Sequence, residues 1–402
     1  MAKKTIEELA SGFHVWDPDI QANPYPALER LQSECPMARS EMFGGYWLLT
    51  KYADIREVLS DASLWSSSVP ALPKPPMERS LNYIPVGVDP PEHTAYRRVL
   101  GPVFGPARVA RLEPDFRARV RGYIEEIKTT PRPVDFLKVF AIPYPCFTIL
   151  RTFGLPDEDF DLLFDFKVKL FDEQYSPDPE VAKHFADVTT PVITRYFVKQ
   201  IERRRGPDAP DDALTGIVNA KFKGERDLTN DEIVSIATLI LSAGLDTVTA
   251  ELSFFMDYFA KNPDRWQEII DHPDRIPGAV EELLRINSIV SLHRHATRDT
   301  EVNGRTFSAG DFVQLSLPAS SFDADQFPDP HTVDFERTPN RHMAFGGGPH
   351  RCFGSNLARA ELVIALEELS KAFSTVSYPE GYTAPRNFGL VMNILDQRLV
   401  FA

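Results

Sequence analysis

The spacing of apolar and polar residues divides the chain into a mixed opening region, a long helical middle and a smaller region with strands. Residues 23–34 have helical periodicity, and residues 46–50 predict a strand with a helix directly behind it at residues 52–60. Helical periodicity then dominates from residue 94 to about residue 249. Clusters of Pro, Asp and Gly interrupt it at residues 176–179 and 206–212. The pattern predicts a mainly α protein with a large helical core.

A small sheet is expected beside the helices after residue 285. Asn303 and Gly304 form a two-residue turn signal between short strand-like runs, and residues 311–317 predict a further strand. Between residues 66 and 91 the chain carries seven prolines, which exclude a continuous helix and predict a long irregular surface segment. We expect this segment and the loop at residues 176–179 to open and close over a binding pocket.

Composition and charge narrow the classes of function. The 402 residues are 43% hydrophobic, which is enough for a large buried core. A net charge of −14 argues against binding to nucleic acid or to an anionic membrane, whereas a small apolar substrate is compatible with it. The opening residues lack the apolar core of a signal peptide, and the charge-free apolar stretch at residues 233–245 is shorter than the roughly 20 residues that span a bilayer. We expect a cytoplasmic protein without a membrane anchor.

The three cysteines are too widely spaced and too few for a disulfide framework, so each is interpreted singly. Cys35 and Cys146 have ordinary neighbours and are interpreted as structural. Cys352 differs because it lies in the glycine-rich segment 345–354 (FGGGPHRCFG), which leads directly into a predicted helix. Glycines let the backbone approach a flat ligand closely, and amides at the start of a helix favour a thiolate. The alternative is a phosphate cradle or a simple turn.

A second unusual segment lies within the longest predicted helix, which begins with a capping box at residues 229–232 and runs to about Lys261. Gly244 in mid-helix costs about 1 kcal/mol relative to alanine, and the Thr247 hydroxyl is expected to bond back to a preceding carbonyl and bend the helix. Asp246 adds an acid to an apolar run. Locally unfavourable choices of this kind indicate a site. The alternative is that Asp246 pairs with an arginine and Thr247 only packs.

Two pairs of charged residues lie at helical spacing. Glu282 and Arg285 are three residues apart, which by itself predicts a surface ion pair worth less than about 1 kcal/mol. His93 and Arg97 are four apart near the start of a predicted helix, so both can face one anionic partner. The alternative for this second pair is a solvated helix face.

The segment 345–354 resembles the haem-binding signature of the cytochromes P450, Phe-Gly-x-Gly-x-His-x-Cys-x-Gly, at every fixed position. The resemblance extends from about residue 23 to the C-terminus. It implies a cytochrome P450 fold, haem b as the cofactor and Cys352 as the axial ligand of the iron, with Phe345 and Gly348 in the haem-binding loop. It further implies a single domain over residues 1–402, made up of a mixed part at about 20–65 that pairs with strands at about 295–320, a helical core at about 92–285, and the haem-thiolate loop and helix at 345–372.

The same resemblance implies roles for residues outside the loop. Thr247 is expected to hold oxygen and its waters by hydrogen bonds, and Asp246 to relay protons from solvent. The expected reaction is a monooxygenation, in which one oxygen atom of O2 enters a small apolar substrate. The haem propionates are expected on His93, Arg97, Arg294 and His350, and a buried structural ion-pair network on Glu282, Arg285 and Arg337.

Within the family the chain is most similar to bacterial camphor hydroxylase, at residues 83–85, 246–248, 252–254 and 275–285. Leu81 stands where that enzyme is expected to present a tyrosine hydroxyl to the camphor ketone, so this hydrogen bond is lost. We therefore expect loose apolar binding of a terpenoid or norisoprenoid of about ten to thirteen carbons. The positions that align with substrate contacts, which ordinary core packing also explains, are Leu72, Leu81, Leu239, Ile240, Ser242, Leu390 and Val391.

Electrons are expected from outside the chain, which has no second cysteine cluster and no flavin-binding domain. The expected donors are NAD(P)H, a flavoprotein reductase and an acidic [2Fe-2S] ferredoxin that docks on Arg97, Arg351 and Arg359 of a monomer. One alternative is a peroxygenase that uses hydrogen peroxide, and the acid–alcohol pair at residues 246–247 weighs against it. Another is a non-catalytic haem sensor. A zinc site at Cys352 is disfavoured because no Cys-x-x-Cys is present.

Overall fold

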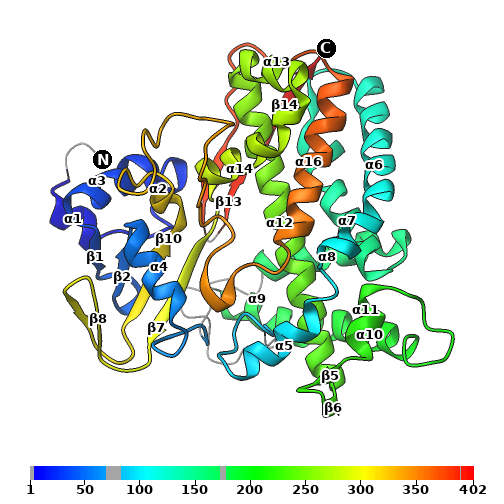
Figure 1. The fold of residues 1–402 in the computed structure, drawn as a ribbon, viewed down its shortest axis with the longest axis horizontal. Helices are drawn as coiled ribbons and strands as arrows, with labels where there is room; N and C mark the ends of the chain where they lie inside the picture. Colours follow the sequence, from blue (N-terminus) through cyan, green and yellow to red (C-terminus); the bar gives the residue numbers. More distant parts are fainter. Residues whose placement is uncertain (1–3, 69–82, 173–177, 390) are drawn as a thin grey trace.

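The chain folds into a helical side and a strand-rich side, which lie next to each other in Figure 1. The computed structural model describes residues 4–68, 83–172, 178–389 and 391–402. The N-terminus lies on the strand-rich side and the C-terminus at one end of the helical side (Figure 1). The α-helices are α1 (Ile6–Ser11), α2 (Pro18–Ala22), α3 (Tyr25–Glu34), α4 (Tyr52–Ser60), α5 (Glu92–Leu100), α6 (Pro106–Thr129), α7 (Pro143–Phe153), α8 (Phe160–Asp172), α9 (Pro179–His184), α10 (Thr190–Glu202), α11 (Ala213–Val218), α12 (Asn230–Lys261), α13 (Pro263–Asp271), α14 (Ile276–Asn287), α15 (Leu317–Ser320) and α16 (Ser355–Ala372).

The largest sheet joins the opening strands to strands from the last third of the chain. Its order is β1-β2-β10-β7-β3. Strand β2 pairs antiparallel with β1 and parallel with β10, and β10 pairs antiparallel with β7. The strands are β1 (Met37–Ser40), β2 (Tyr46–Leu49), β3 (Trp65–Ser66), β4 (Val134–Asp135), β5 (Lys221–Phe222), β6 (Arg226–Asp227), β7 (Ser291–Ala296), β8 (Thr300–Val302), β9 (Arg305–Phe307), β10 (Phe312–Ser316), β11 (Val376–Ser377), β12 (Arg386–Phe388), β13 (Met392–Ile394) and β14 (Arg398–Phe401).

The turn signals and strong periodicities of the sequence correspond to real elements. Asn303 and Gly304 connect β8 to β9 with φ angles of 47° and 77°, and such a tight hairpin turn requires positive φ at both residues. The predicted strand at residues 46–50 and the helix behind it are β2 and α4. The predictions missed β4, β5 and β6, because a two-residue strand carries no readable alternation.

Helix α12 is the central element of the helical side. The Thr229 hydroxyl accepts the Glu232 N–H while the Glu232 carboxylate accepts the Thr229 N–H, so the predicted capping box is confirmed. The helix packs against α7 and α10 and also against α16 and β13. Of the helices in the described ranges, α12 is the one long and apolar enough to cross a membrane, and most of its apolar stretch is buried inside the protein. A helix covered on all sides is expected to be apolar all round.

Candidate active site

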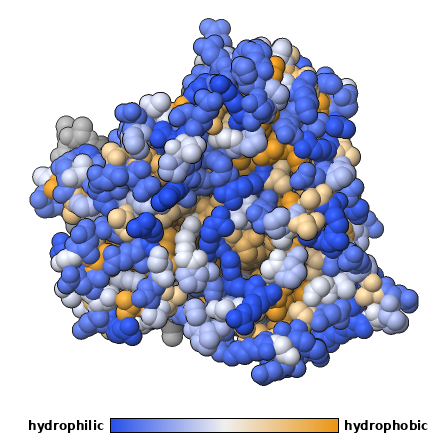
Figure 2. Space-filling view, viewed as in Figure 1, coloured by the Kyte–Doolittle hydropathy of each residue, from blue (hydrophilic) through white to orange (hydrophobic). Residues whose placement is uncertain are grey.

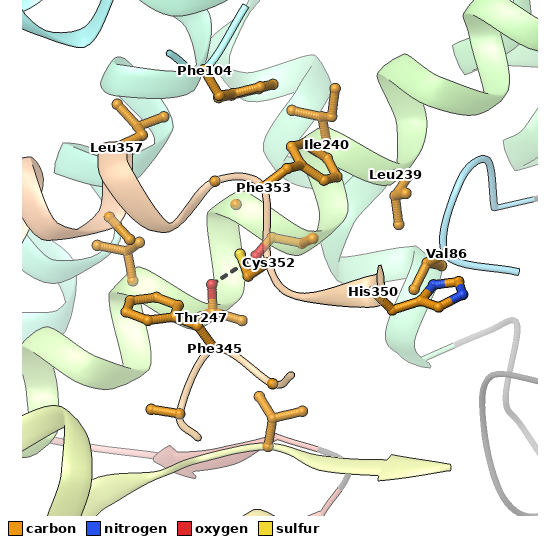
Figure 3. Close-up of a pocket in the computed structure, with 18 of the residues that line it drawn as sticks. Val86, Phe104, Leu239, Ile240, Thr247, Phe345, His350, Cys352, Phe353 and Leu357 are labelled. Carbon is orange, nitrogen blue, oxygen red and sulfur yellow. Dashed lines mark hydrogen bonds between the residues drawn. The ribbon is translucent and has the colours of Figure 1, made fainter. Parts of the chain in front are cut away.

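A cavity of about 300 Å³ lies between α12 and the Cys352 loop. Its wall is predominantly apolar, with Leu239 and Ile240 from α12 and Phe345 from the loop among the residues that face it in Figure 3. Apolar surface is visible between hydrophilic surroundings near the middle of the face in Figure 2. A cavity of this size and character suits a small organic ligand.

The Cys352 loop is a closed turn with a strict requirement for glycine at one position. The Cys352 N–H donates to the Phe345 carbonyl at 2.9 Å, which closes the loop. Gly348 has a φ of +62°, and a Cβ atom at this position would overlap the backbone carbonyl of Leu59. Gly347 differs, because a Cβ atom there would meet the Leu59 side chain at 3.4 Å, an ordinary contact. Glycine at position 348 therefore lets the loop lie directly against α4.

The Cys352 thiol faces the cavity just before α16 begins. Burial raises the pKa of this thiol, and the Gly354 N–H together with the cationic Arg97, Arg351 and Arg359 opposes that increase. The amide at the start of α16 therefore favours the thiolate, as expected from the sequence, and burial opposes it. Metal binding would displace the proton, because the thiolate is the ligating form.

One end of the cavity holds a stack of two histidines. The His93 and His350 rings lie with centroids 3.8 Å apart and planes 30° apart. His93 Nδ1 and His350 Nε2 are buried and have no hydrogen-bond partner among the described residues. Burial lowers the pKa of His93 to about 4, with Arg97 adding to the effect, and burial with Arg294 lowers the pKa of His350 to about 3. Both rings are therefore neutral at neutral pH.

Two arginines complete this basic end of the cavity. Arg294 is buried, and burial lowers its pKa to about 10 against an opposing effect of Asp89. Arg97 donates to the Arg351 carbonyl at 2.7 Å. Asp89 is itself engaged, because its carboxylate accepts hydrogen bonds from Ser66 Oγ and from the Ser67 N–H.

The basic end therefore holds more buried cationic and donor groups than anions to match them. A buried polar atom without a partner is rare in native proteins and points to a missing ligand. Carboxylates suit such a site, because arginine binds them with charge-assisted hydrogen bonds. A flat cofactor with carboxylate arms at one edge, whose metal faces Cys352, fits the residues present.

Thr247 and Asp246 lie differently relative to the cavity. Thr247 lines it and donates a hydrogen bond to the Ala243 carbonyl at 2.8 Å, the dashed line in Figure 3. This is the back-bond expected from the sequence. Asp246 is buried but is not among the described residues that line the cavity.

The helical assignment of α12 is continuous through these residues, from Asn230 to Lys261. Gly244 serves packing here, since a Cβ atom on it would approach the Ile149 side chain to 2.6 Å. The glycine in mid-helix therefore lets α7 lie close to α12.

Glu282, Arg285 and Arg337 meet in a fully satisfied buried cluster. Arg285 binds both Glu282 oxygens, at 2.7 and 2.8 Å, and neither side chain has any exposed surface. Arg337 Nε adds a bond to Glu282 at 3.0 Å. The remaining donors of the two guanidinium groups are directed to backbone carbonyls of the loop before the Cys352 segment, at Ser321, Pro328, Asp329, Pro330 and Thr332.

The positions expected to contact substrate are placed unevenly. Leu239 and Ile240 line the cavity. The Ser242 hydroxyl instead bonds to the Thr238 and Leu239 carbonyls of its own helix. Val391 pairs in an isolated bridge with Val290, which is a lining residue. Leu72, Leu81 and Leu390 lie outside the described residues, as does much of the proline-rich segment.

The three arginines of the expected docking patch are not equally available. Arg351 is exposed and lies next to Cys352. Arg359 binds Glu281 with two hydrogen bonds, at 2.5 and 2.9 Å, and its guanidinium carbon lies 4.5 Å from the centroid of the Phe345 ring. Burial would raise the pKa of Glu281, but His342 and Arg359 hold it at about 2. Much of the charge of Arg359 is therefore matched within the protein.

Two acids on the cavity wall were not predicted from the sequence. Glu251 on α12 and Glu361 on α16 both line the cavity and are buried. Thr148 Oγ1 donates to Glu361 at 2.8 Å, and burial raises the pKa of Glu361 to about 8. An available signal for Glu251 was its position in an apolar run four residues after Thr247, the spacing that places two side chains on one helix face. Within the described ranges, no group of three or more His, Cys, Asp and Glu side chains is placed to hold a metal ion.

Comparison with known proteins gives one consistent result. Residues 148–400 match the family model described as Cytochrome P450. The chain is 34% identical over 345 residues to "Probable cytochrome P450 127A1" of Sinorhizobium fredii, covering 86% of this chain and 80% of that protein. It is 32% identical to the pentalenic acid synthase of Streptomyces avermitilis, covering 86% of each chain.

Solved structures of cytochromes P450 have the same fold as this chain. The crystal structure of CYP101C1 superposes with a TM-score of 0.87 at 28% identity, covering 97% of both chains. That of CYP101J2 also gives a TM-score of 0.87, at 25% identity, over 97% of this chain and 96% of the other.

Proposed function

The chain belongs to the cytochrome P450 family, and from this premise we propose that it hydroxylates a small apolar terpenoid or norisoprenoid. Membership makes the protein a haem b monooxygenase with the mainly α fold of that family. The substrate, the role of each site residue and the electron donor belong to the proposal. The observation that carries it is the cavity with Cys352 at its wall and a surplus of unmatched basic groups at one end.

In this proposal, two groups of residues would hold the two ends of the cofactor. His93, Arg97, Arg294 and His350 would hold the haem propionates, and the Cys352 sulfur would bind the iron. When bound, the haem supplies the activation of O2, so that one oxygen atom enters the substrate and the other leaves as water. A neutral histidine with a free nitrogen can donate to a carboxylate through its N–H, and Arg294 supplies a full charge.

Thr247 would act on the distal side of the cavity. Its hydroxyl proton is used by the Ala243 carbonyl, so the lone pairs of Oγ1 remain free to accept hydrogen bonds from water or from a protonated oxygen. Asp246 would bring protons toward this hydroxyl from the other side of α12. The apolar wall, with Leu239 and Ile240, would exclude bulk water and bind the hydrocarbon part of the substrate at about 25 cal/mol per Å².

Electrons would come from NAD(P)H through a reductase and a [2Fe-2S] ferredoxin. The proposed docking face is the exposed surface around Arg351, with Arg98 of α5 as a second exposed arginine. Arg359 contributes less than the sequence implied, because Glu281 pairs with it. We further propose that the protein works in the cytoplasm as a monomer.

The test is an absorbance spectrum of the purified protein, reduced and exposed to carbon monoxide, for wild type and Cys352→Ala. Thiolate ligation predicts a strongly red-shifted Soret band in the wild type and its loss in the variant. Product formed from a terpenoid panel with ferredoxin, reductase and NAD(P)H supports the monooxygenase. Turnover with hydrogen peroxide alone would instead indicate a peroxygenase, and a haem-loaded protein without product in either assay would indicate a sensor. A chain that binds no haem contradicts the proposal.

A further inference from the structure

Glu251 is a buried acid that no protein group satisfies. Its side chain lies on the cavity wall with a residue exposure of 6%, and its Oε2 has no hydrogen-bond partner within the described ranges. Leaving such an atom unbonded is costly, and native proteins satisfy nearly all of them with protein, water or ligand. Because Glu251 faces a cavity, the missing partner belongs to whatever fills that cavity.

The position of Glu251 on α12 directs its carboxyl toward the part of the cavity that Thr247 also lines. It follows Thr247 by four residues, which is about one helical turn, so both side chains lie on the same helix face. Helical side chains lean toward the N-terminus of their helix, which brings the carboxyl toward the turn that carries Thr247. The neighbouring wall is apolar and includes Leu284, Ile289 and Val290.

The surroundings keep this acid protonated. Burial raises the pKa of the Glu251 carboxyl well above its usual range. The nearby Tyr25 hydroxyl donates to the Ile286 carbonyl at 3.5 Å, and burial raises its pKa, with Arg386 opposing and Glu251 adding to the increase. A neutral carboxylic acid has one O–H donor, so Glu251 can donate to an oxygen atom of a ligand.

The other polar groups of the cavity wall have assigned partners, except that Glu361 Oε2 is likewise buried without a partner in the described ranges. Thr247 donates to Ala243, and one oxygen of Glu361 accepts from Thr148. The histidines and arginines at the basic end match the carboxylates of the cofactor. Glu251 thus remains as an acid donor on an otherwise apolar stretch of wall.

We propose that Glu251 is the polar anchor of the substrate pocket and donates a hydrogen bond to a carbonyl or ether oxygen of the substrate. The inference rests on the proposed function and names its substrate class: oxygenated terpenoids or norisoprenoids rather than hydrocarbons of the same shape. Glu251 would then supply, from a different element of the fold, the hydrogen bond that a tyrosine is expected to make in camphor hydroxylase and that Leu81 cannot make in this chain.

The test measures binding, not turnover, on the haem-loaded chain. Dissociation constants are determined by equilibrium dialysis for matched pairs of a ketone and the hydrocarbon with the same skeleton: camphor with bornane, and menthone with p-menthane. The quantity compared is the ratio of hydrocarbon to ketone dissociation constants. Glu251→Leu should lower this ratio about tenfold relative to the wild type, the loss expected for one hydrogen bond. Glu251→Gln should lower it less, because the amide still donates.

A matched control and a spectroscopic readout separate the anchor from a structural effect. Glu361→Gln alters a second acid of the same cavity and should leave the ratio unchanged. In the infrared difference spectrum between wild type and Glu251→Gln at neutral pH, a protonated carboxyl band of Glu251 should appear, whereas the band of Glu361, whose pKa is about 8, is common to both proteins and cancels. The Glu251 band should move to lower frequency with a ketone and stay in place with the hydrocarbon.

Three results would overturn the anchor: an unchanged ratio in Glu251→Leu, a ratio that depends on Glu361, or a wild type that binds no ketone of the panel. The carbon monoxide spectrum of each variant checks folding and haem binding. A normal thiolate band with an unchanged ratio removes the anchor alone, whereas absence of that band in the wild type would remove the proposed function itself.

Discussion

Two buried polar clusters of this protein contain the same kinds of side chain and are built in opposite ways. In the Glu282–Arg285 cluster each guanidinium meets a carboxylate and backbone carbonyls. In the cluster of His93, His350 and Arg294 the cationic and donor groups outnumber the acceptors, and buried ring nitrogens have no partner. The first cluster is complete without a ligand, and the second is not.

This difference in hydrogen-bond satisfaction distinguishes a polar cluster that stabilises the fold from one that binds a ligand, without comparison to another protein. A satisfied cluster contributes to the fold, because removing one partner leaves a buried charge unmatched. An unsatisfied cluster lowers the stability of the empty protein, and a bound anion recovers that free energy. The two clusters should therefore respond in opposite directions to the loss of an arginine.

The largest effect is expected at the complete cluster. Arg285→Ala leaves the Glu282 carboxylate buried beside the single remaining cation, Arg337, and should lower the free energy of unfolding by about 3–5 kcal/mol, with and without haem. Urea unfolding followed by circular dichroism measures it. The control is Arg30→Ala, which removes an exposed i,i+4 pair with Glu34 and should change stability by less than about 0.5 kcal/mol. Equal effects of the two substitutions would contradict the comparison.

At the incomplete cluster, loss of an arginine should have smaller effects, and these effects should differ between the apoprotein and the haem-loaded protein. Arg294→Met removes a buried cation that has no dedicated anion, so the apoprotein should be as stable as wild type or more stable. The haem-loaded protein should lose its cofactor roughly ten- to a hundredfold faster, because a charge-assisted hydrogen bond to a carboxylate contributes about 1.5–3 kcal/mol. Haem transfer to excess apomyoglobin gives the rate.

Arg98→Met is the control for that rate, since this arginine belongs to α5, the helix that carries His93, but is exposed. It should leave haem loss unchanged. An apoprotein destabilised as strongly by Arg294→Met as by Arg285→Ala would show that the basic cluster is structural after all.

The sequence was informative wherever a site is built from residues on one short segment. The Cys352 loop, the capping box of α12 and the pair Glu282–Arg285 each lie within a few residues, so spacing alone brings their side chains together. The strands β2 and β10 were also predicted locally, from short strand-like runs of residues. Local periodicity therefore predicts which side chains share a face.

Periodicity does not show what lies opposite that face. Glu281 of α14 neutralises Arg359 of α16, a pairing between helices that are adjacent only in the folded protein. The Ser242 side chain bonds to its own helix and not to the cavity. Glu251 was missed because the sequence does not show that this acid of an apolar helix faces a cavity. Burial across elements is the information that the sequence lacked.

The smallest expected effect is a pH dependence of the free energy of unfolding that comes from His93 of the incomplete cluster. His93 has an ordinary pKa of 6.5, and burial with Arg97 lowers it to about 4 in the folded chain. Between these values the unfolded chain binds more protons than the folded one, so the contribution of this histidine to stability is fully present above pH 6.5 and is lost as pH falls toward 4. The contribution of His93 to the free energy of unfolding of the apoprotein should therefore rise with pH from 5 to 6.5. The difference between wild type and His93→Phe isolates this contribution, because His350, whose pKa is also lowered, and Glu251 and Glu361, whose pKa values are raised, affect the slope of both proteins.

His93→Phe should show a smaller slope of unfolding free energy against pH than wild type, and haem should lower the slope of the wild type, because a propionate beside His93 favours the protonated ring. Urea unfolding at a series of pH values measures the slope. An identical slope in wild type and variant would mean that His93 binds a proton as readily in the folded chain as in the unfolded chain. The contrast between the two clusters would then not extend to its histidines.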